Sequence, residues 1–362
     1  MHIKLDNLDL EKLQKLIETK NININIADML FSSFFEEKIV DNKKYKVLIK
    51  NKKSEDIYFS SLMDYFSLDM DDEENIALTS EYIYPHLCLL KENEYLSNPY
   101  VKLIKNTIIN KNYSLKYLSY KPFQLLPIDE IKVNEDEYYQ EYSQVGYFEK
   151  GFNYLALLDK NDIWMSVNPN EINTMKPYIE KSNGDVLVLG LGMGYISFIM
   201  SEKENVKSIT IIEKEKKIID IFKENILVKF PHKEKIKIIE NDAIEYLADN
   251  EIKYDYIFAD LWHDPNDGLP IYIKLHNLEY QKSIKIHYWL ETSIIAMLRR
   301  YLITLMEENL LGYNDKNYMK SQNDEDKMIN YLYNLTKKLS FTSYEQIHDY
   351  LSFENLREFN FN

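Results

Sequence analysis

The chain has 362 residues, of which 45% are hydrophobic, a length and balance typical of a folded protein with two domains or one extended domain. Its formal net charge of −15 argues against a broad nucleic-acid footprint, and only Arg299, Arg300 and Arg357 could recognise phosphates or bases with a guanidinium group. No apolar run approaches the roughly 20 residues that span a bilayer, and the N-terminus lacks a secretory-signal pattern, so we expect a cytoplasmic protein with no membrane partner.

We predict that residues 1–142 form a mostly helical N-terminal domain. Leucine and isoleucine side chains recur on one helical face between residues 5 and 20, and acids lie near its start, which indicates an amphipathic helix. The region up to about residue 125 stays rich in Tyr, Phe, Leu and Ile. An acidic run at residues 69–74 interrupts it, and we interpret this run as a solvated loop.

Short aromatic and β-branched segments begin near residue 143 and predict a β-meander. The segments QVGYF, NYLALLD and DIWMSV are separated by Gly151 and by the turn-prone Lys160–Asp162. A helix is expected from Glu171 to Ile179, and a turn then leads into the next apolar run.

Strand-like and helix-like segments alternate regularly after Gly184. The expected strands are Val186–Leu189, Ser208–Ile212, Ile236–Ile239 and Tyr256–Ala259, and the expected helices are Tyr195–Met200, Lys216–Lys223 and Ala243–Leu247. Apolar strands that alternate with helices indicate a parallel sheet covered on both faces. We therefore predict an α/β fold with a Rossmann-like, doubly wound, mostly parallel sheet.

The rest of the chain completes the predicted organisation. Residues 143–312 are assigned to the β-meander and the Rossmann-like domain, and residues 313–362 to a small helical tail with helices near 323–339 and 343–351. Before the tail, an apolar helix is expected to end at Arg299 and Arg300.

Three of the chain's eight glycines, Gly190, Gly192 and Gly194, occupy alternate positions directly after a strand-like run. A backbone that turns sharply after a buried strand and passes close to a ligand has no room for a Cβ atom. The spacing does not fit the dinucleotide fingerprint, which needs a glycine or alanine three positions after its second glycine. It does not fit the phosphate loop either, because the Gly-Lys-Ser or Gly-Lys-Thr ending is missing. The alternative is a tight turn without a ligand.

Acids follow the next two strands. Glu213 ends the segment SITIIE, where a carboxylate can accept hydrogen bonds from both ribose hydroxyls. Asp242, followed by Ala243, ends the third strand, where it can accept a bond from an adenine amino group while a neighbouring amide donates to the ring. The alternatives are a solvated surface acid for Glu213 and a helix N-cap for Asp242.

In order and spacing, VLVLGLGMG, IIE, ENDA and YDYIFADLW resemble the class I S-adenosylmethionine-dependent methyltransferases over residues 184–264. The resemblance implies a Rossmann-like fold and S-adenosylmethionine as the cofactor. The residues implied to touch it are Gly190, Leu191, Gly192, Met193 and Gly194 beneath the methionine part, Glu213 at the ribose, Asp242 and Ala243 at the adenine, and Asp260 beside the transfer site.

A second, narrower resemblance is to the spermidine synthases. The segment YSQVGYFEKGFNYLALLDKNDIWMSVNPNEINTM resembles the β-hairpin region that precedes their nucleotide fold, and Asp260–Pro265 is similar to their acidic loop with one extra residue. Met193 stands where the family loop has an aspartate, and Ile172–Met175 lacks the family's Tyr-His-Glu-Met pattern. The resemblance implies shared ancestry, while these two departures count against aminopropyl transfer.

Asp260, His263 and Asp264 are the candidate catalytic residues, because they follow the fourth strand at the edge where open parallel sheets bind ligands. A carboxylate or imidazole there can accept a proton from the attacking group or stabilise the sulfonium charge. The alternatives are loop capping by Asp264 and solvent exposure of His263. Trp262 either walls the acceptor pocket or seals the core.

We predict methyl transfer from S-adenosylmethionine to an unidentified acceptor, either a small molecule or a protein. The rivals are aminopropyl transfer and a non-catalytic nucleotide-binding scaffold. No metal site is expected, because Cys88 is the only cysteine and the sequence around His276 and His287 has no HExxH spacing. The sequence allows a homodimer but does not predict the oligomeric state.

Overall fold

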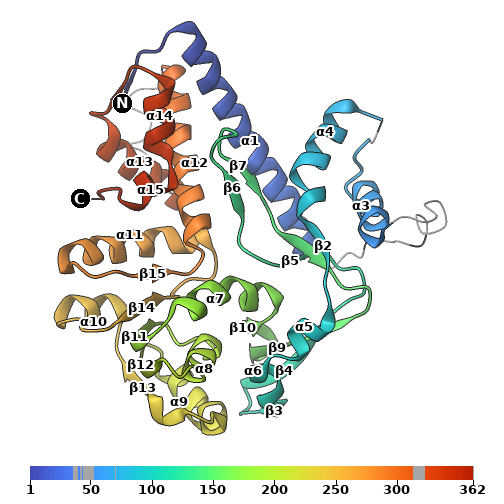
Figure 1. Cartoon of the computed structure of the whole chain (residues 1–362), viewed down its shortest axis with the longest axis vertical. Coiled ribbons are helices and arrows are strands. Elements are labelled where there is room, and N and C mark those ends of the chain that lie inside the picture. The colour runs from blue at the N-terminus through green and yellow to red at the C-terminus, as the bar shows by residue number, and fades with distance from the viewer. Residues whose placement is uncertain (36–39, 41–42, 44–52, 70, 313–322, 362) are drawn as a thin grey trace.

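The computed structural model describes residues 1–35, 40, 43, 53–69, 71–312 and 323–361 (Figure 1). A parallel sheet lies in the second half of the chain, antiparallel strands precede it, and helices dominate both ends of the sequence. Within the described ranges, no helix combines the length and the apolar character needed to cross a membrane.

Five strands form an all-parallel sheet in the order β13-β12-β11-β14-β15. The apolar run from Val186 to Leu189 places β11 in the centre of this sheet, where all four side chains are fully buried. The strands are β11 (Gly184–Leu189), β12 (Val206–Glu213), β13 (Ile236–Glu240), β14 (Tyr256–Ala259) and β15 (His287–Tyr288). The first four confirm the predicted strands. The sequence gives no signal for β15, because two residues are too few for an apolar or alternating pattern.

Helices connect the parallel strands as the predicted alternation requires. These helices are α7 (Pro169–Lys181) before β11, then α8 (Tyr195–Ser201), α9 (Lys216–Asn225), α10 (Ala243–Asp249) and α11 (Pro265–Lys282), with 3-10 turns η2 (Leu227–Lys229) and η3 (Lys233–Lys235) before β13. The chain runs from β11 to β12 and β13 on one side, and then crosses to the other side of β11 for β14. The α/β class is therefore confirmed. In open parallel sheets, ligands bind at the carboxyl ends of the strands beside such a reversal.

The predicted β-meander is only partly right. A four-stranded antiparallel sheet contains β3 (Thr107–Ile108), β4 (Tyr113–Tyr120), β9 (Phe152–Asp159) and β10 (Asp162–Val167), in the order β10-β9-β4-β3. The hairpin β9–β10 is as expected. The first predicted strand, β8 (Val145–Tyr147), instead pairs with β2 (Leu87–Leu89) and β5 (Leu126–Pro127). Gly146 permits this pairing, because a Cβ atom there would lie 2.9 Å from the carbonyl oxygen of Cys88.

The N-terminal region contains helices and more strands than predicted. Its helices are α1 (Asn7–Phe35), α3 (Ser54–Tyr65), α4 (Glu73–Tyr82), η1 (Tyr84–His86), α5 (Glu92–Leu96) and α6 (Pro99–Leu103). The acidic run is exposed where it is described, and Asp72 caps α4 by accepting from Glu74 N. Strand β4 pairs with β9 along its whole length, across the predicted domain limit at residue 142, and the domain limits themselves stay a prediction.

The C-terminal helices pack against the opening helix, so the two ends of the chain meet. They are α12 (Glu291–Leu310), α13 (Asp324–Thr336), α14 (Tyr344–Leu351) and α15 (Phe353–Arg357), and β1 (His2–Ile3) pairs in parallel with β16 (Ser340–Phe341). Helix α12 does not end at Arg299 and Arg300, as the sequence pattern suggested. It continues to Leu310 because the apolar pattern continues, with Leu302, Ile303, Leu305 and Met306 buried, while both arginines bind carboxylates.

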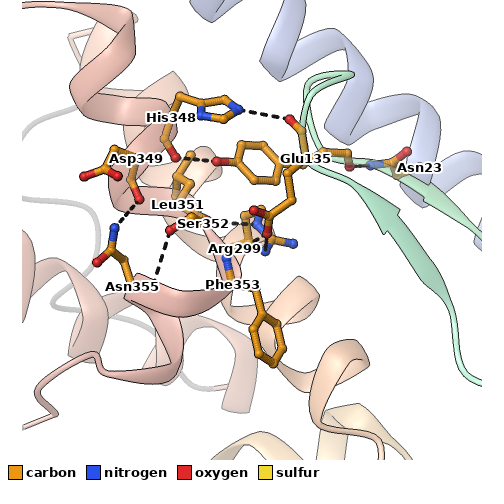
Figure 2. A network of polar contacts seen from close by, with 10 residues as sticks. Asn23, Glu135, Arg299, His348, Asp349, Leu351, Ser352, Phe353 and Asn355 are labelled. Carbon is orange, nitrogen blue, oxygen red and sulfur yellow. Dashed lines mark hydrogen bonds and ion pairs between the residues drawn. The ribbon is translucent and has the colours of Figure 1, made fainter.

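A polar network joins the hairpin β6 (Lys132–Asn134)–β7 (Gln140–Tyr142) to α1, α12 and the C-terminal helices (Figure 2). The buried Arg299 donates from Nε to the carbonyl oxygen of Leu351 at 2.8 Å and pairs with Glu135 Oε1 at 3.2 Å. The same oxygen of Glu135 accepts from Phe353 N at 2.7 Å, and Asn23 of α1 hydrogen-bonds to the hairpin backbone. These contacts hold together segments that are far apart in the sequence.

Candidate functional site

The glycine loop between β11 and α8 has the backbone that its sequence predicts. Gly190, Gly192 and Gly194 all have positive φ, at 97°, 51° and 74°. A Cβ atom on Gly190 would lie 2.0 Å from the carbonyl oxygen of Asp260, so the ends of β11 and β14 touch here. A Cβ atom on Gly192 would meet nothing within 4 Å. The loop therefore combines one close backbone contact with open space beside it.

Glu213 lies at the end of β12 and faces the glycine loop. Its Oε2 accepts from Leu191 N at 3.2 Å, and its Oε1 accepts from Glu215 N at 2.7 Å. The residue is partly buried, which contradicts the alternative of a solvated surface acid. A carboxylate has about four lone-pair sites, so these two bonds leave capacity for ribose hydroxyls. The ribose role stays a prediction.

Asp242 is the N-cap of α10, as its alternative interpretation proposed. Its Oδ1 accepts from Ile244 N at 2.8 Å and from Glu245 N at 3.2 Å. Its Oδ2 accepts no bond from any described residue, so capping and adenine contact are compatible. Ala243, at the first position of the helix, is buried.

The three candidate catalytic residues differ in their surroundings. Asp260 is partly buried, and its backbone N–H donates to the carbonyl oxygen of Leu189 at 2.9 Å, which ties it to the glycine loop. Asp264 is the N-cap of α11, where it forms a capping box with Asp267. The side chain of His263 is 76% exposed and lies 2.9 Å from Asp267 Oδ2. The capping and exposure alternatives are therefore confirmed for Asp264 and His263, while Asp260 lies at the loop.

Trp262 seals the core beneath this edge. Its side chain is buried, its Nε1 donates to the carbonyl oxygen of Trp289 at 3.2 Å, and Gly268 packs against its ring. Trp289 in turn donates from Nε1 to Thr174 Oγ1 at 3.0 Å. Both indoles therefore fix the packing of α7 and α11 on the sheet.

Glu171 is an acid that the sequence analysis did not single out. It lies in the first turn of α7 and is partly buried, and Asn168 caps its backbone at 3.0 Å. Burial, with the nearby charge of Asp260, raises the pKa of the Glu171 carboxyl. Burial likewise raises the pKa of Asp260, whereas the charge of His263 lowers it. Both carboxyl groups are therefore harder to ionise than ordinary surface acids.

Helix α6 supplies a second group of residues that the sequence analysis missed. The hydroxyl of Tyr100 donates to the carbonyl oxygen of Met193, and Asn98 Nδ2 donates to Tyr195 Oη at 3.1 Å. The side chain of Met193 is only 4% exposed. The N-terminal region therefore packs directly on the glycine loop and fixes its shape.

A cavity of about 590 Å³ opens on another side of α7 and contains none of the predicted site residues. It is lined by residues of β2, α5 and α7, among them Tyr95 and Asn173. Asn173 Nδ2 donates to Tyr95 Oη at 3.2 Å and to the carbonyl oxygen of Ile128 at 2.7 Å. These two polar groups therefore have partners within the protein, whereas the predicted site residues lie at the glycine loop. Across the described ranges, no group of His, Cys, Asp and Glu is arranged to hold a metal ion.

Residues 169–272 match the family model of the spermine/spermidine synthase domain. This segment is similar to spermine and spermidine synthases. The synthase-like segment begins with α7 and ends within α11, so it contains Glu171, the glycine loop, Glu213, Asp242 and Asp260. The predicted resemblance is thus confirmed. No curated protein matches the chain.

Solved structures with partial similarity include both classes of enzyme. They are a spermidine synthase from Thermotoga maritima (TM-score 0.30, 15% identity, 41% of this chain and 55% of that chain), the S-adenosylhomocysteine-bound methyltransferase PaMTH1 from Podospora anserina (0.27, 21%, 32% and 49%), and a putative O-methyltransferase from Klebsiella pneumoniae (0.21, 19%, 25% and 40%). Each alignment spans less than two thirds of the solved chain.

Proposed function

We propose that this chain binds S-adenosylmethionine at the carboxyl ends of β11, β12 and β13, within a doubly wound sheet, and transfers its methyl group to an acceptor. The observation that carries the proposal is the contact between the ends of β11, β12 and β14. The backbone of Gly190 touches that of Asp260, and Glu213 accepts from Leu191 N in the same loop. This junction lies at the reversal of strand order, where open parallel sheets bind nucleotides.

The residues at this edge fit such a nucleotide. Glu213 and Asp242 offer carboxylate oxygens for ribose hydroxyls and for an adenine amino group, and the space at Gly192 admits a ligand to the backbone. The donor supplies an alkyl group on an electrophilic sulfonium. The protein then needs mainly to orient the acceptor and to exclude water, a task in which Asp260 can accept a proton from the attacking group.

Aminopropyl transfer is the second candidate, and the match of residues 169–272 to the synthase domain favours it. Methyl transfer is preferred because of Met193. A thioether cannot accept a strong charged hydrogen bond from the primary amine that a decarboxylated donor exposes. The Met193 side chain is also buried, and its carbonyl oxygen is already occupied by Tyr100.

A comparison of donors separates the two chemistries. We expect intact S-adenosylmethionine to bind at least as tightly as its decarboxylated analogue, and we expect no conversion of putrescine to spermidine. Isothermal titration with each donor and a chromatographic polyamine assay measure these two quantities. Tighter binding of the decarboxylated donor, together with spermidine formation that Asp260→Asn abolishes, would establish aminopropyl transfer instead.

Glu213→Ala is expected to weaken nucleotide binding by about 1.5 to 3 kcal/mol, roughly tenfold or more, because acceptors for two ribose hydroxyls are lost. Titration with S-adenosylhomocysteine measures the dissociation constant. Glu224→Ala is a matched control, since Glu224 is an exposed acid on α9. An unchanged dissociation constant in Glu213→Ala would show that Glu213 stabilises the glycine loop but does not contact the nucleotide.

A further inference from the structure

The glycine loop between β11 and α8 lies on a buried group of aromatic rings. A Cβ atom on Gly194 would lie 2.2 Å from a ring carbon of Phe222, so the loop backbone packs directly on that ring. Phe222 contacts Phe230 edge to face, and Tyr100 contacts both Phe230 and Phe198 in the same way, with ring centroids 5.5 to 6.2 Å apart. Because Tyr100 belongs to α6, the N-terminal region supplies one of the rings beneath the loop.

The hydroxyl of Tyr100 also bonds to the loop backbone. It donates to the carbonyl oxygen of Met193, which is the third residue of a turn closed by a 2.9 Å bond from Gly194 N to the carbonyl oxygen of Leu191. Gly192 and Gly194, on either side of Met193, both have positive φ. Glycine has no Cβ atom to restrict its φ and ψ, so the neighbouring peptide groups have little intrinsic preference for one orientation. A buried carbonyl needs a donor, and the bond from Tyr100 therefore favours one orientation of the Met193 peptide group.

Helix α6 is itself held on both sides. Asn98 Oδ1 accepts from Tyr100 N at 3.0 Å, and Asn98 Nδ2 donates to Tyr195 Oη at 3.1 Å. On the other side, the hydroxyl of Tyr117 in β4 donates to the carbonyl oxygen of Val101 at 2.6 Å. These bonds fix α6 between the antiparallel sheet and α8, so Tyr100 reaches the loop from a firm support.

We infer that Tyr100 is a positioning residue of the nucleotide site, which acts through Met193 and holds the glycine loop in the conformation that accepts the donor. The inference rests on the proposed function and adds the contribution of a helix outside the synthase-like residues 169–272. A loop that is ordered before the ligand arrives loses less conformational freedom on binding. When only a fraction of the molecules has the competent loop, the apparent dissociation constant rises by the inverse of that fraction.

Tyr100→Phe tests the inference, because it removes the hydroxyl and keeps the ring. We expect its affinity for S-adenosylhomocysteine to fall about fivefold, a factor that corresponds to one net hydrogen bond. We also expect the amide hydrogens of residues 190–194 to exchange faster in the ligand-free variant than in the ligand-free wild type. Calorimetric titration and hydrogen exchange followed by mass spectrometry measure these two quantities on the full chain.

Tyr58→Phe is the matched control. Tyr58 is fully buried like Tyr100, and its hydroxyl donates to the carbonyl oxygen of Phe123 at 3.1 Å in a separate hydrophobic cluster. Both variants lose a buried hydroxyl that is bonded to the backbone, so both should unfold at a lower temperature than the wild type. The loss of affinity and the faster exchange of the loop should occur in Tyr100→Phe and not in Tyr58→Phe.

The outcomes separate the inference from the proposed function. If Tyr100→Phe binds S-adenosylhomocysteine as the wild type does, or if Tyr58→Phe loses as much affinity, Tyr100 has a structural role alone and the proposed function stands. A loss of affinity without faster exchange of residues 190–194 would also contradict the inference, because the loop would then be ordered without the hydroxyl. If the wild type does not bind S-adenosylhomocysteine, both the proposed function and the inference are overturned.

Discussion

Gly190→Ala is expected to lower the stability of the protein by about 3 kcal/mol or more and to abolish nucleotide binding. The φ of 97° strains any residue with a Cβ atom. The added atom would also lie 2.0 Å from the carbonyl oxygen of Asp260, and this neighbour is backbone that cannot rotate away. The ends of β11 and β14 would have to separate, which would displace the loop and Asp260 together. Thermal unfolding should show a midpoint lower by roughly 5 °C or more.

Gly192→Ala is the matched control for this prediction. Its φ of 51° is within the range that a non-glycine residue can reach at moderate strain, and its Cβ atom would meet nothing within 4 Å. We expect a stability loss of about 1 kcal/mol, with any loss of S-adenosylhomocysteine binding arising from contact with the ligand. Equal unfolding midpoints for the two variants would contradict the close contact that places Asp260 at the loop.

Arg299→Ala is expected to destabilise the fold by about 3 kcal/mol, because removing the buried guanidinium leaves a backbone carbonyl without its donor and a partly exposed carboxylate without its ion-pair partner. The Leu351 carbonyl would lose its donor, and Glu135 would lose its ion-pair partner (Figure 2). The guanidinium also lies 4.5 Å from the centre of the Tyr139 ring, a contact that alanine cannot replace. Urea denaturation measures the change.

Lys327→Ala supplies the comparison with an ordinary ion pair. Lys327 Nζ lies 2.7 Å from Asp324 Oδ1, but both side chains are largely exposed, at 64% and 98%. Exposed pairs contribute about 0 to 1 kcal/mol, so this variant should unfold at nearly the wild-type urea concentration. If Arg299→Ala behaved in the same way, the network would not hold the C-terminal helices in place.

The central sheet could be predicted because its signals are local. β11, β12, β13 and β14 are short apolar runs with helices between them, so the alternation is visible along the chain. The pairing of β8 with β2 depends on residues about sixty positions apart and on a glycine contact, and no local pattern indicates it. Strand β4 could not be predicted for the same reason, because it pairs with β9, which lies far from it in the sequence.

In the candidate site, too, some residues could be predicted from local sequence signals and others could not. Gly190 and Asp260 each follow a strand and Glu213 ends one. Parallel strands bring their carboxyl ends to one edge of a sheet, so the sequence predicts that these residues meet. Glu171 and Tyr100 come from helices outside the alternation. An acid in the first turn of a helix is ordinary, because it stabilises the helix dipole, and it gives no functional signal by itself.

Calorimetric titration of the wild type with S-adenosylhomocysteine, supported by thermal unfolding, tests the central claim most directly. A ligand that binds only the native state stabilises it by mass action, so we expect saturable heat with one site per chain and an unfolding midpoint that rises with ligand concentration. The binding should disappear in Gly190→Ala and weaken about tenfold in Glu213→Ala. No heat and no thermal shift at ligand concentrations of about one millimolar, a level at which weak binders are still detected, would contradict a nucleotide site at the glycine loop.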